Sequence, residues 1–121
     1  MKNDITEALP AINEAIRQLE VVIGHWISHP GFCMDAVQAA FDALTKHVTP
    51  NVVGSDPYQK RVGWLASSVA TGHDAVRWYA ERGSDYDIKQ ALCAIKRDLC
   101  DIRDEIAWNH NSNDHLNATP R

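Results

Sequence analysis

The chain has 121 residues, of which 45% are hydrophobic and 23% are charged. This length fits one domain with its own hydrophobic core, and the composition is that of a globular rather than a disordered protein. The net charge of -4 argues against a protein that coats nucleic acid, because such proteins contact phosphates with an excess of Lys and Arg.

The first predicted helix covers residues 5–26. Apolar residues recur there at steps of four and three, which places them on one helix face: Ile5, Leu9, Ile12, Ile16, Leu19, Ile23 and Trp26. We expect Asn3 or Asp4 to cap its start and Pro30 to end it. Pro10 either begins the main helix in its first turn or kinks a longer one.

The second predicted helix is shorter and covers residues 35–48, after a connection that begins at Gly31. Its apolar positions again follow steps of four and three: Val37, Phe41, Leu44 and Val48. The charge of Asp35 suits the first turn of a helix, and Pro50 ends the pattern. We expect the loop 49–56 to cover the space that this short helix leaves open.

The third predicted helix begins at Asp56-Pro57, a favourable cap followed by proline in the first helical position. Its apolar face contains Tyr58, Val62, Leu65, Val69, Gly72, Val76 and Tyr79. Gly83 fits the end of this helix. A glycine on the apolar face, Gly72, indicates a close approach of another helix or room for a large residue opposite, with a small ligand cavity as the alternative.

The fourth predicted helix begins at Ser84, with Asp87 three residues later. Its apolar face contains Ile88, Leu92, Ile95, Leu99, Ile102 and Ile106. After Trp108 the residues are polar and lack periodicity, so residues 109–121 are predicted to form a tail outside a single domain, 1–108.

These four segments predict an all-α protein. Short connections make neighbouring helices antiparallel, and an apolar period of 3.5 favours crossing angles near ~20°. We therefore expect an antiparallel up-down-up-down four-helix bundle with a short second helix and a polar C-terminal tail.

The start of the chain and its cysteines indicate the compartment. The first thirty residues contain no signal peptide, and no apolar run approaches the roughly 20 residues of a membrane helix. The three cysteines include no CxxC pair, so we expect them to be reduced and mostly buried. These features predict a soluble cytoplasmic protein that does not contact a membrane.

Two groups of histidines are candidate metal ligands. His25 and His29 are four residues apart, which puts both on one helix face. A metal site there needs a third ligand, and the helix dipole explains histidines near a helix end equally well.

The second group is the dipeptide His73-Asp74, followed by Arg77. It is similar to the His-Asp-x-x-Lys core of the HD phosphohydrolases, which are all-α metal enzymes that cleave phosphoesters. The resemblance implies a metal at His73 and Asp74, with His47 and either Asp98 or Asp101 completing the site. Arg77 stands where that family has lysine.

The most informative aromatic residues are Trp64 and Trp78, which lie beside the apolar face of the third predicted helix. Fourteen residues, nearly four turns, separate them, so the two rings line up. Arg61 and Arg82 bracket the pair. Aligned tryptophans with arginines are typical of interface hot spots. The alternatives are a core that they widen against a neighbouring helix, or an aromatic wall for a ligand.

Three acidic residues of the fourth predicted helix, Asp98, Asp101 and Glu105, follow steps of three and four and form one edge. Such an edge is usually a solvated surface, and it can alternatively dock on a basic partner.

The leading functional hypothesis is a small non-enzymatic interaction protein of the adaptor, inhibitor or regulator type. It would bind a protein partner or a second copy of itself through Trp64, Trp78, Arg61 and Arg82, assisted by the acidic edge, and would need no cofactor. One alternative is a metal-dependent HD-type phosphohydrolase that uses His73 and Asp74. The other is a protein that binds a small metabolite or nucleotide between helices near Gly72.

Overall fold

The computed structural model describes the backbone of residues 5–25, 31–47 and 57–118, and the side chains of residues 5–24, 33–47 and 61–108. This part of the chain forms a short 3-10 helix and four α-helices: η1 (Ile5–Ala8), α1 (Leu9–His25), α2 (Gly31–Thr45), α3 (Pro57–Glu81) and α4 (Asp85–Ala118). It contains no strand. The predicted all-α class and the four helices are confirmed.

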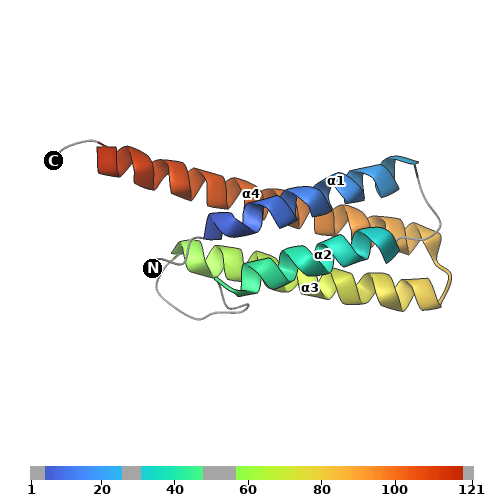
Figure 1. The fold of residues 1–121 in the computed structure, drawn as a ribbon. Coiled ribbons are helices and arrows are strands. Elements are labelled where there is room, and N and C mark those ends of the chain that lie inside the picture. Colours follow the sequence, from blue (N-terminus) through green and yellow to red (C-terminus); the bar gives the residue numbers. More distant parts are fainter. Residues whose placement is uncertain (1–4, 26–30, 48–56, 119–121) are drawn as a thin grey trace.

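The four helices pack against one another in a ring of contacts (Figure 1). In the described residues the backbone of α1 lies close to α2 and α4, and that of α3 lies close to α4 and α2, whereas α1 and α3 are opposite each other, as are α2 and α4. The contact between α3 and α4 is the most extensive of the four. No described helix is long and apolar enough to cross a membrane.

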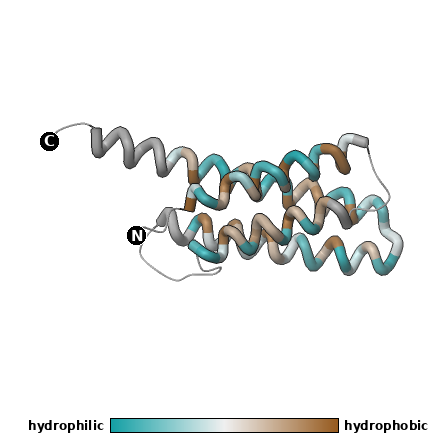
Figure 2. The backbone as a smooth tube through the Cα atoms, in the orientation of Figure 1, coloured by the Kyte–Doolittle hydropathy of each residue, from teal (hydrophilic) through white to brown (hydrophobic). Residues whose placement is uncertain are grey.

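The core contains most of the apolar positions that the sequence pattern marks, together with unmarked residues such as Ala15 and Met34. Figure 2 shows apolar and hydrophilic residues alternating along the helices, as expected of helices with one buried face. Every predicted apolar position of α4 is buried: Ile88, Leu92, Ile95, Leu99, Ile102 and Ile106. In α1 the buried face is shifted slightly, because Val22 is buried whereas Ile23 is only partly buried.

Pro10 is the second residue of α1, after the 3-10 turn η1. A proline lacks the amide proton that a helix interior requires, but the first turn of a helix has no acceptor for that proton. The first of the two alternatives for Pro10 is therefore confirmed. The predicted caps at Asn3 and Asp4, together with Trp26 and Pro30, lie outside the described residues.

Helix α2 differs from its predicted range at both ends. It begins at Gly31 rather than Asp35 and ends at Thr45 rather than Val48. Cys33 is buried together with Val37, so the apolar face continues one turn further toward the N-terminus than predicted. The loop 49–56, which is predicted to cover this region, lies outside the described residues.

The turn between α3 and α4 follows the prediction closely. Gly83 has a φ of 68°, a conformation that glycine adopts without strain. The amide of Ser84 donates to the carbonyl of Tyr79 at 3.2 Å, and the amide of Gly83 donates to that of Ala80 at 3.2 Å. This is a Schellman motif. The hydroxyl of Ser84 then donates to Asp87 at 2.6 Å, at the start of α4.

Helix α4 does not end near Trp108. Its backbone is helical to Ala118, and Figure 1 shows it continuing beyond the ends of the other helices. The predicted end of the fourth helix near Trp108 is therefore wrong, because the helix continues to residue 118. Six of the ten residues 109–118 are Asn, Ser or Asp, which favour caps and turns over helix interiors, so the composition did not reveal this continuation.

Gly72 allows α3 and α4 to approach closely. A Cβ atom built on Gly72 would lie 2.6 Å from Cγ1 of Ile95, far inside van der Waals contact. The large residue opposite the glycine is thus Ile95 of α4. That side chain fills the space beside the Cα of Gly72, so the interpretation of this glycine as a close approach of two helices is confirmed, whereas a metabolite site near it stays a prediction.

Candidate partner-binding surface

Trp64 and Trp78 are both exposed on α3. Trp64 is 63% accessible to solvent and Trp78 is 52% accessible. Their neighbours Leu65 and Val76 take the buried positions, so the rings do not widen the core. Fourteen residues of helix place the two rings within about 40° of each other and about 21 Å apart along the axis. We call the surface that these two rings and the arginines beside them form the tryptophan face.

The arginine beside Trp78 is held in place by that ring. The guanidinium carbon of Arg82 lies 3.4 Å from the centre of the Trp78 ring, a cation–π contact. Arg82 also donates to the backbone carbonyl of Trp78 at 3.0 Å. Tyr79 meets the ring edge-on at 5.4 Å between ring centres. These contacts order the Trp78 end of the tryptophan face before any partner binds.

Arg61, at the other end of the tryptophan face, is paired with helix α4. Its Nε donates to a carboxylate oxygen of Glu105 at 2.9 Å. Two of the predicted site residues are therefore joined directly, across the α3–α4 contact. Because Arg61 lies one turn before Trp64, this ion pair links the tryptophan face to the acidic side of α4.

Asp98 does not belong to an exposed acidic edge. Asp98 is only 7% accessible to solvent, and its carboxylate accepts a hydrogen bond from the hydroxyl of Ser68 at 2.6 Å. The prediction that Asp98 is solvated or contacts a partner is wrong. The step of three from Asp98 to Asp101 turns the helix enough for Asp98 to face α3 while Asp101 lies at the margin.

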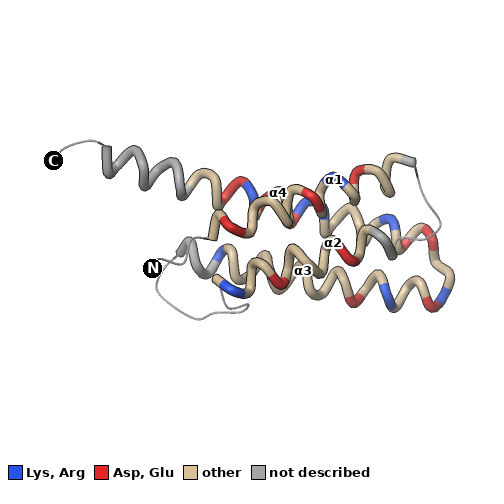
Figure 3. The backbone as a smooth tube through the Cα atoms, in the orientation of Figure 1, with Lys and Arg blue, Asp and Glu red and all other residues tan. Residues whose placement is uncertain are grey.

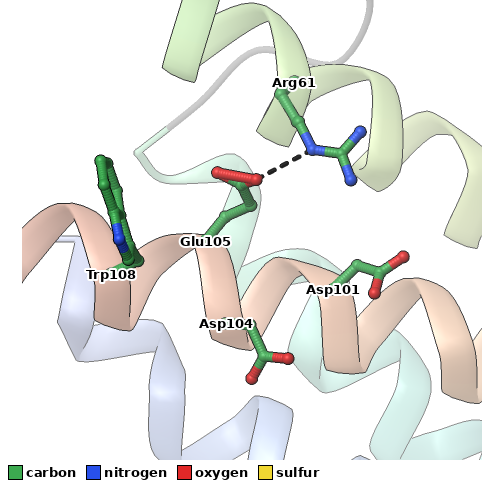
Figure 4. A pocket seen from close by; sticks show the side chains of 5 residues that line it. All are labelled: Arg61, Asp101, Asp104, Glu105 and Trp108. Atoms are coloured by element: carbon green, nitrogen blue, oxygen red, sulfur yellow. Dashed lines mark hydrogen bonds and ion pairs between the residues drawn. The ribbon is translucent and has the colours of Figure 1, made fainter.

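A shallow groove of about 500 Å³ lies where α3 meets α4, lined by Arg61, Asp101, Asp104, Glu105 and Trp108 (Figure 4). We call it the acidic groove. Figure 4 shows Glu105 reaching across to Arg61, with Trp108 and Asp101 at opposite ends of the row on α4. Trp108 is 69% accessible.

Two residues of the acidic groove were not predicted from the sequence. Asp104 and Trp108 continue the spacing of Asp101 and Glu105 on α4, since residues three, four and seven apart share a helix face. The helical spacing in the sequence was therefore enough to add Asp104 and Trp108 to this face. The expected end of the helix at Trp108 removed the reason to extend the acidic edge to this ring.

The HD-like pair is not completed into a metal site. His73 is partly buried and Asp74 exposed, and both line a small cavity of about 90 Å³ between α2 and α3, beside Phe41. In the described residues no group of three or more His, Cys, Asp or Glu side chains could hold a metal ion.

The residues that the HD resemblance would recruit lie elsewhere. His47 is next to Glu7, with 3.7 Å between Nε2 and Oε1, and Asp98 bonds to Ser68. The other candidate pair cannot be placed, because the side chain of His25 and the whole of His29 lie outside the described residues.

Comparisons of the chain with protein-family models, with curated proteins and with solved structures found no match. The function of the chain is therefore inferred from its own residues.

Proposed function

We propose that this chain is a small non-enzymatic interaction protein that binds a protein partner, or a second copy of itself, through the tryptophan face. One observation carries the proposal: Trp64 and Trp78 are both exposed and aligned on α3. Binding there would block or scaffold the partner, as adaptors, inhibitors and regulators do.

The energetics of exposed tryptophans support this proposal. Tryptophan and arginine are enriched among the residues that contribute most to protein–protein binding, because a large ring buries much apolar area and loses little conformational freedom. Arg82 already rests on Trp78 at 3.4 Å. That ordering lowers the entropy lost when a partner covers the pair.

The arrangement of the helices supports a rigid surface. We propose that they form an up-down-up-down antiparallel bundle, a topology favoured by the short Schellman turn between α3 and α4. The tryptophan face would then be carried by α3, which packs most extensively against α4. Surfaces on packed helices position their side chains better than loops do.

The test compares the wild type with the double variant Trp64→Ala/Trp78→Ala. A third protein, Val21→Ala, changes an exposed residue of α1 and serves as the control. All three proteins are tagged, and each is used to capture binding partners from a lysate of the organism that encodes the chain. The proposal predicts a protein, or untagged copies of the chain, retained by the wild type and by Val21→Ala but not by the double variant. Identical retention by all three would contradict it.

A stability control is needed, because an unfolded variant also loses its partners. Exposed rings predict that each substitution costs less than about 1 kcal/mol of unfolding free energy, whereas truncating a buried tryptophan costs about 3–5 kcal/mol. Denaturant unfolding of the double variant distinguishes the two cases. A loss of the larger size would place the rings in the core and remove the basis of the proposal.

A further inference from the structure

The acidic groove holds more carboxylates than cations. Its lining contains three carboxylates and one guanidinium, that of Arg61. Glu105 is paired with Arg61 at 2.9 Å, and Asp104 accepts a hydrogen bond from Arg103 at 3.2 Å. Asp101 has no hydrogen-bond or ion-pair partner in the described part of the chain. The groove therefore presents an uncompensated negative charge to an incoming ligand.

The groove also presents a free aromatic ring. Trp108 is 69% accessible, and in the described residues the only cation stacked on a tryptophan is Arg82 on Trp78. That pair shows, within the same molecule, the contact that a guanidinium makes with an indole ring. The ion pair between Glu105 and Arg61 likewise shows that a carboxylate of the groove accepts a guanidinium.

Among the residues that the structure describes, Arg61 is the only Lys or Arg that lines the groove. Figure 3 shows Lys and Arg interspersed with Asp and Glu along the described part of α4. About 10 Å of helix separates Asp101 from Trp108, a span that an extended peptide covers in about three residues. One basic segment can thus bring one cation to each end.

We propose that the acidic groove binds an arginine-containing basic segment of the partner, with one guanidinium stacked on Trp108 and another paired with Asp101. This inference rests on the proposed function, since it names the chemistry of the partner. Arginine fits better than lysine, because a planar guanidinium stacks on an indole ring and pairs with a carboxylate through two hydrogen bonds.

The experiment uses a fluorescein-labelled peptide of alternating arginine and serine, which places its arginines on one side when extended. Fluorescence anisotropy measures its affinity for the wild type, Asp101→Asn and Trp108→Ala. The matched controls are Asp35→Asn, an exposed carboxylate on α2, and Tyr86→Ala, an exposed ring near the start of α4. Circular dichroism melting confirms that every variant is folded. A peptide with lysine in place of arginine provides the cation control.

We expect each groove substitution to weaken binding by about fivefold, the size of one exposed cation–π or ion-pair contact. The two controls should leave the affinity unchanged within about twofold, and the lysine peptide should bind less tightly than the arginine peptide. Absence of binding, equal losses in the groove variants and the controls, or equal affinity for both peptides would overturn the inference.

The two proposals fail separately. Trp64→Ala/Trp78→Ala keeps both ends of the acidic groove, so it should bind the peptide as the wild type does. If the peptide behaves as expected but no protein depends on the tryptophan face, the proposed function fails and the groove inference stands. If a partner depends on the tryptophan face but the peptide does not bind as expected, the groove inference fails and the proposed function stands.

Discussion

The contact between Gly72 and Ile95 gives a prediction with a definite sign. In Gly72→Ala, the new methyl group would lie 2.6 Å from Cγ1 and 3.2 Å from Cδ1 of Ile95. Ile95 is fully buried, and a β-branched side chain in a helix has essentially one favourable χ1 rotamer. The methyl group must therefore separate α3 from α4 or force Ile95 into a strained rotamer.

Two opposing effects set the magnitude. Alanine in a helix interior is favoured over glycine by about 1 kcal/mol, whereas overpacking a dense core costs about 1–3 kcal/mol. We expect Gly72→Ala to lose about 1 kcal/mol of unfolding free energy. Gly24→Ala in α1 is the matched control, because nothing lies within 4 Å of a Cβ built there. It should gain up to about 1 kcal/mol.

The assay is urea unfolding followed by circular dichroism, with a shift of the midpoint at constant slope taken as a change in stability. In an Ile95→Ala background the opposing methylene groups are absent, so Gly72→Ala should be stabilising there. A Gly72→Ala protein as stable as the wild type, or more stable, would refute the close approach of the two helices.

Three further predictions concern buried groups. Ser68→Ala removes the hydroxyl that donates to the buried carboxylate of Asp98, so it should lower the free energy of unfolding, measured with urea, by about 1–3 kcal/mol. Thr71→Ala, at an exposed position of α3, is the control, and an equal loss in both variants would contradict the prediction. A thiol reagent should modify the exposed Cys93 quickly and the buried Cys33 only on unfolding; equal rates would contradict the described burial. Burial raises the pKa of the Cys33 thiol from 9.0 to about 11. The stability that the buried thiol contributes is therefore complete below pH 9 and is lost as the pH rises toward 11. The free energy of unfolding of Cys33→Ala should lack that decline.

The sequence predicted the turn between α3 and α4 well because its signals are local. Gly83 supplies the positive φ and Ser84 begins the next helix, and both effects act within a few residues. The helix ends at Gly31 and Ala118 were missed for a different reason. The start of α2 depends on whether neighbouring helices bury its first turn, which periodicity within one segment does not reveal. The last turns of α4 extend beyond the other helices, and their polar residues carry no periodic signal.

The candidate site was predictable in part. Helical spacing aligned Trp64 with Trp78, but it did not determine whether a neighbouring helix covers them. Asp98 was misplaced because its burial depends on Ser68, a partner thirty residues away in the sequence. Tertiary packing decides such cases, and it is also what brings Trp108 of α4 beside Arg61 of α3 in the acidic groove.

The most direct test of the central claim is site-specific photo-crosslinking. A photoreactive phenylalanine replaces Trp64 in one protein and the exposed Val21 of α1 in another, and each is irradiated in a lysate of the organism that encodes the chain. If the tryptophan face binds a partner or a second copy of the chain, irradiation should give a discrete crosslinked product from position 64 and none from position 21. No adduct at position 64, or the same adducts from both positions, would contradict a binding role for this surface.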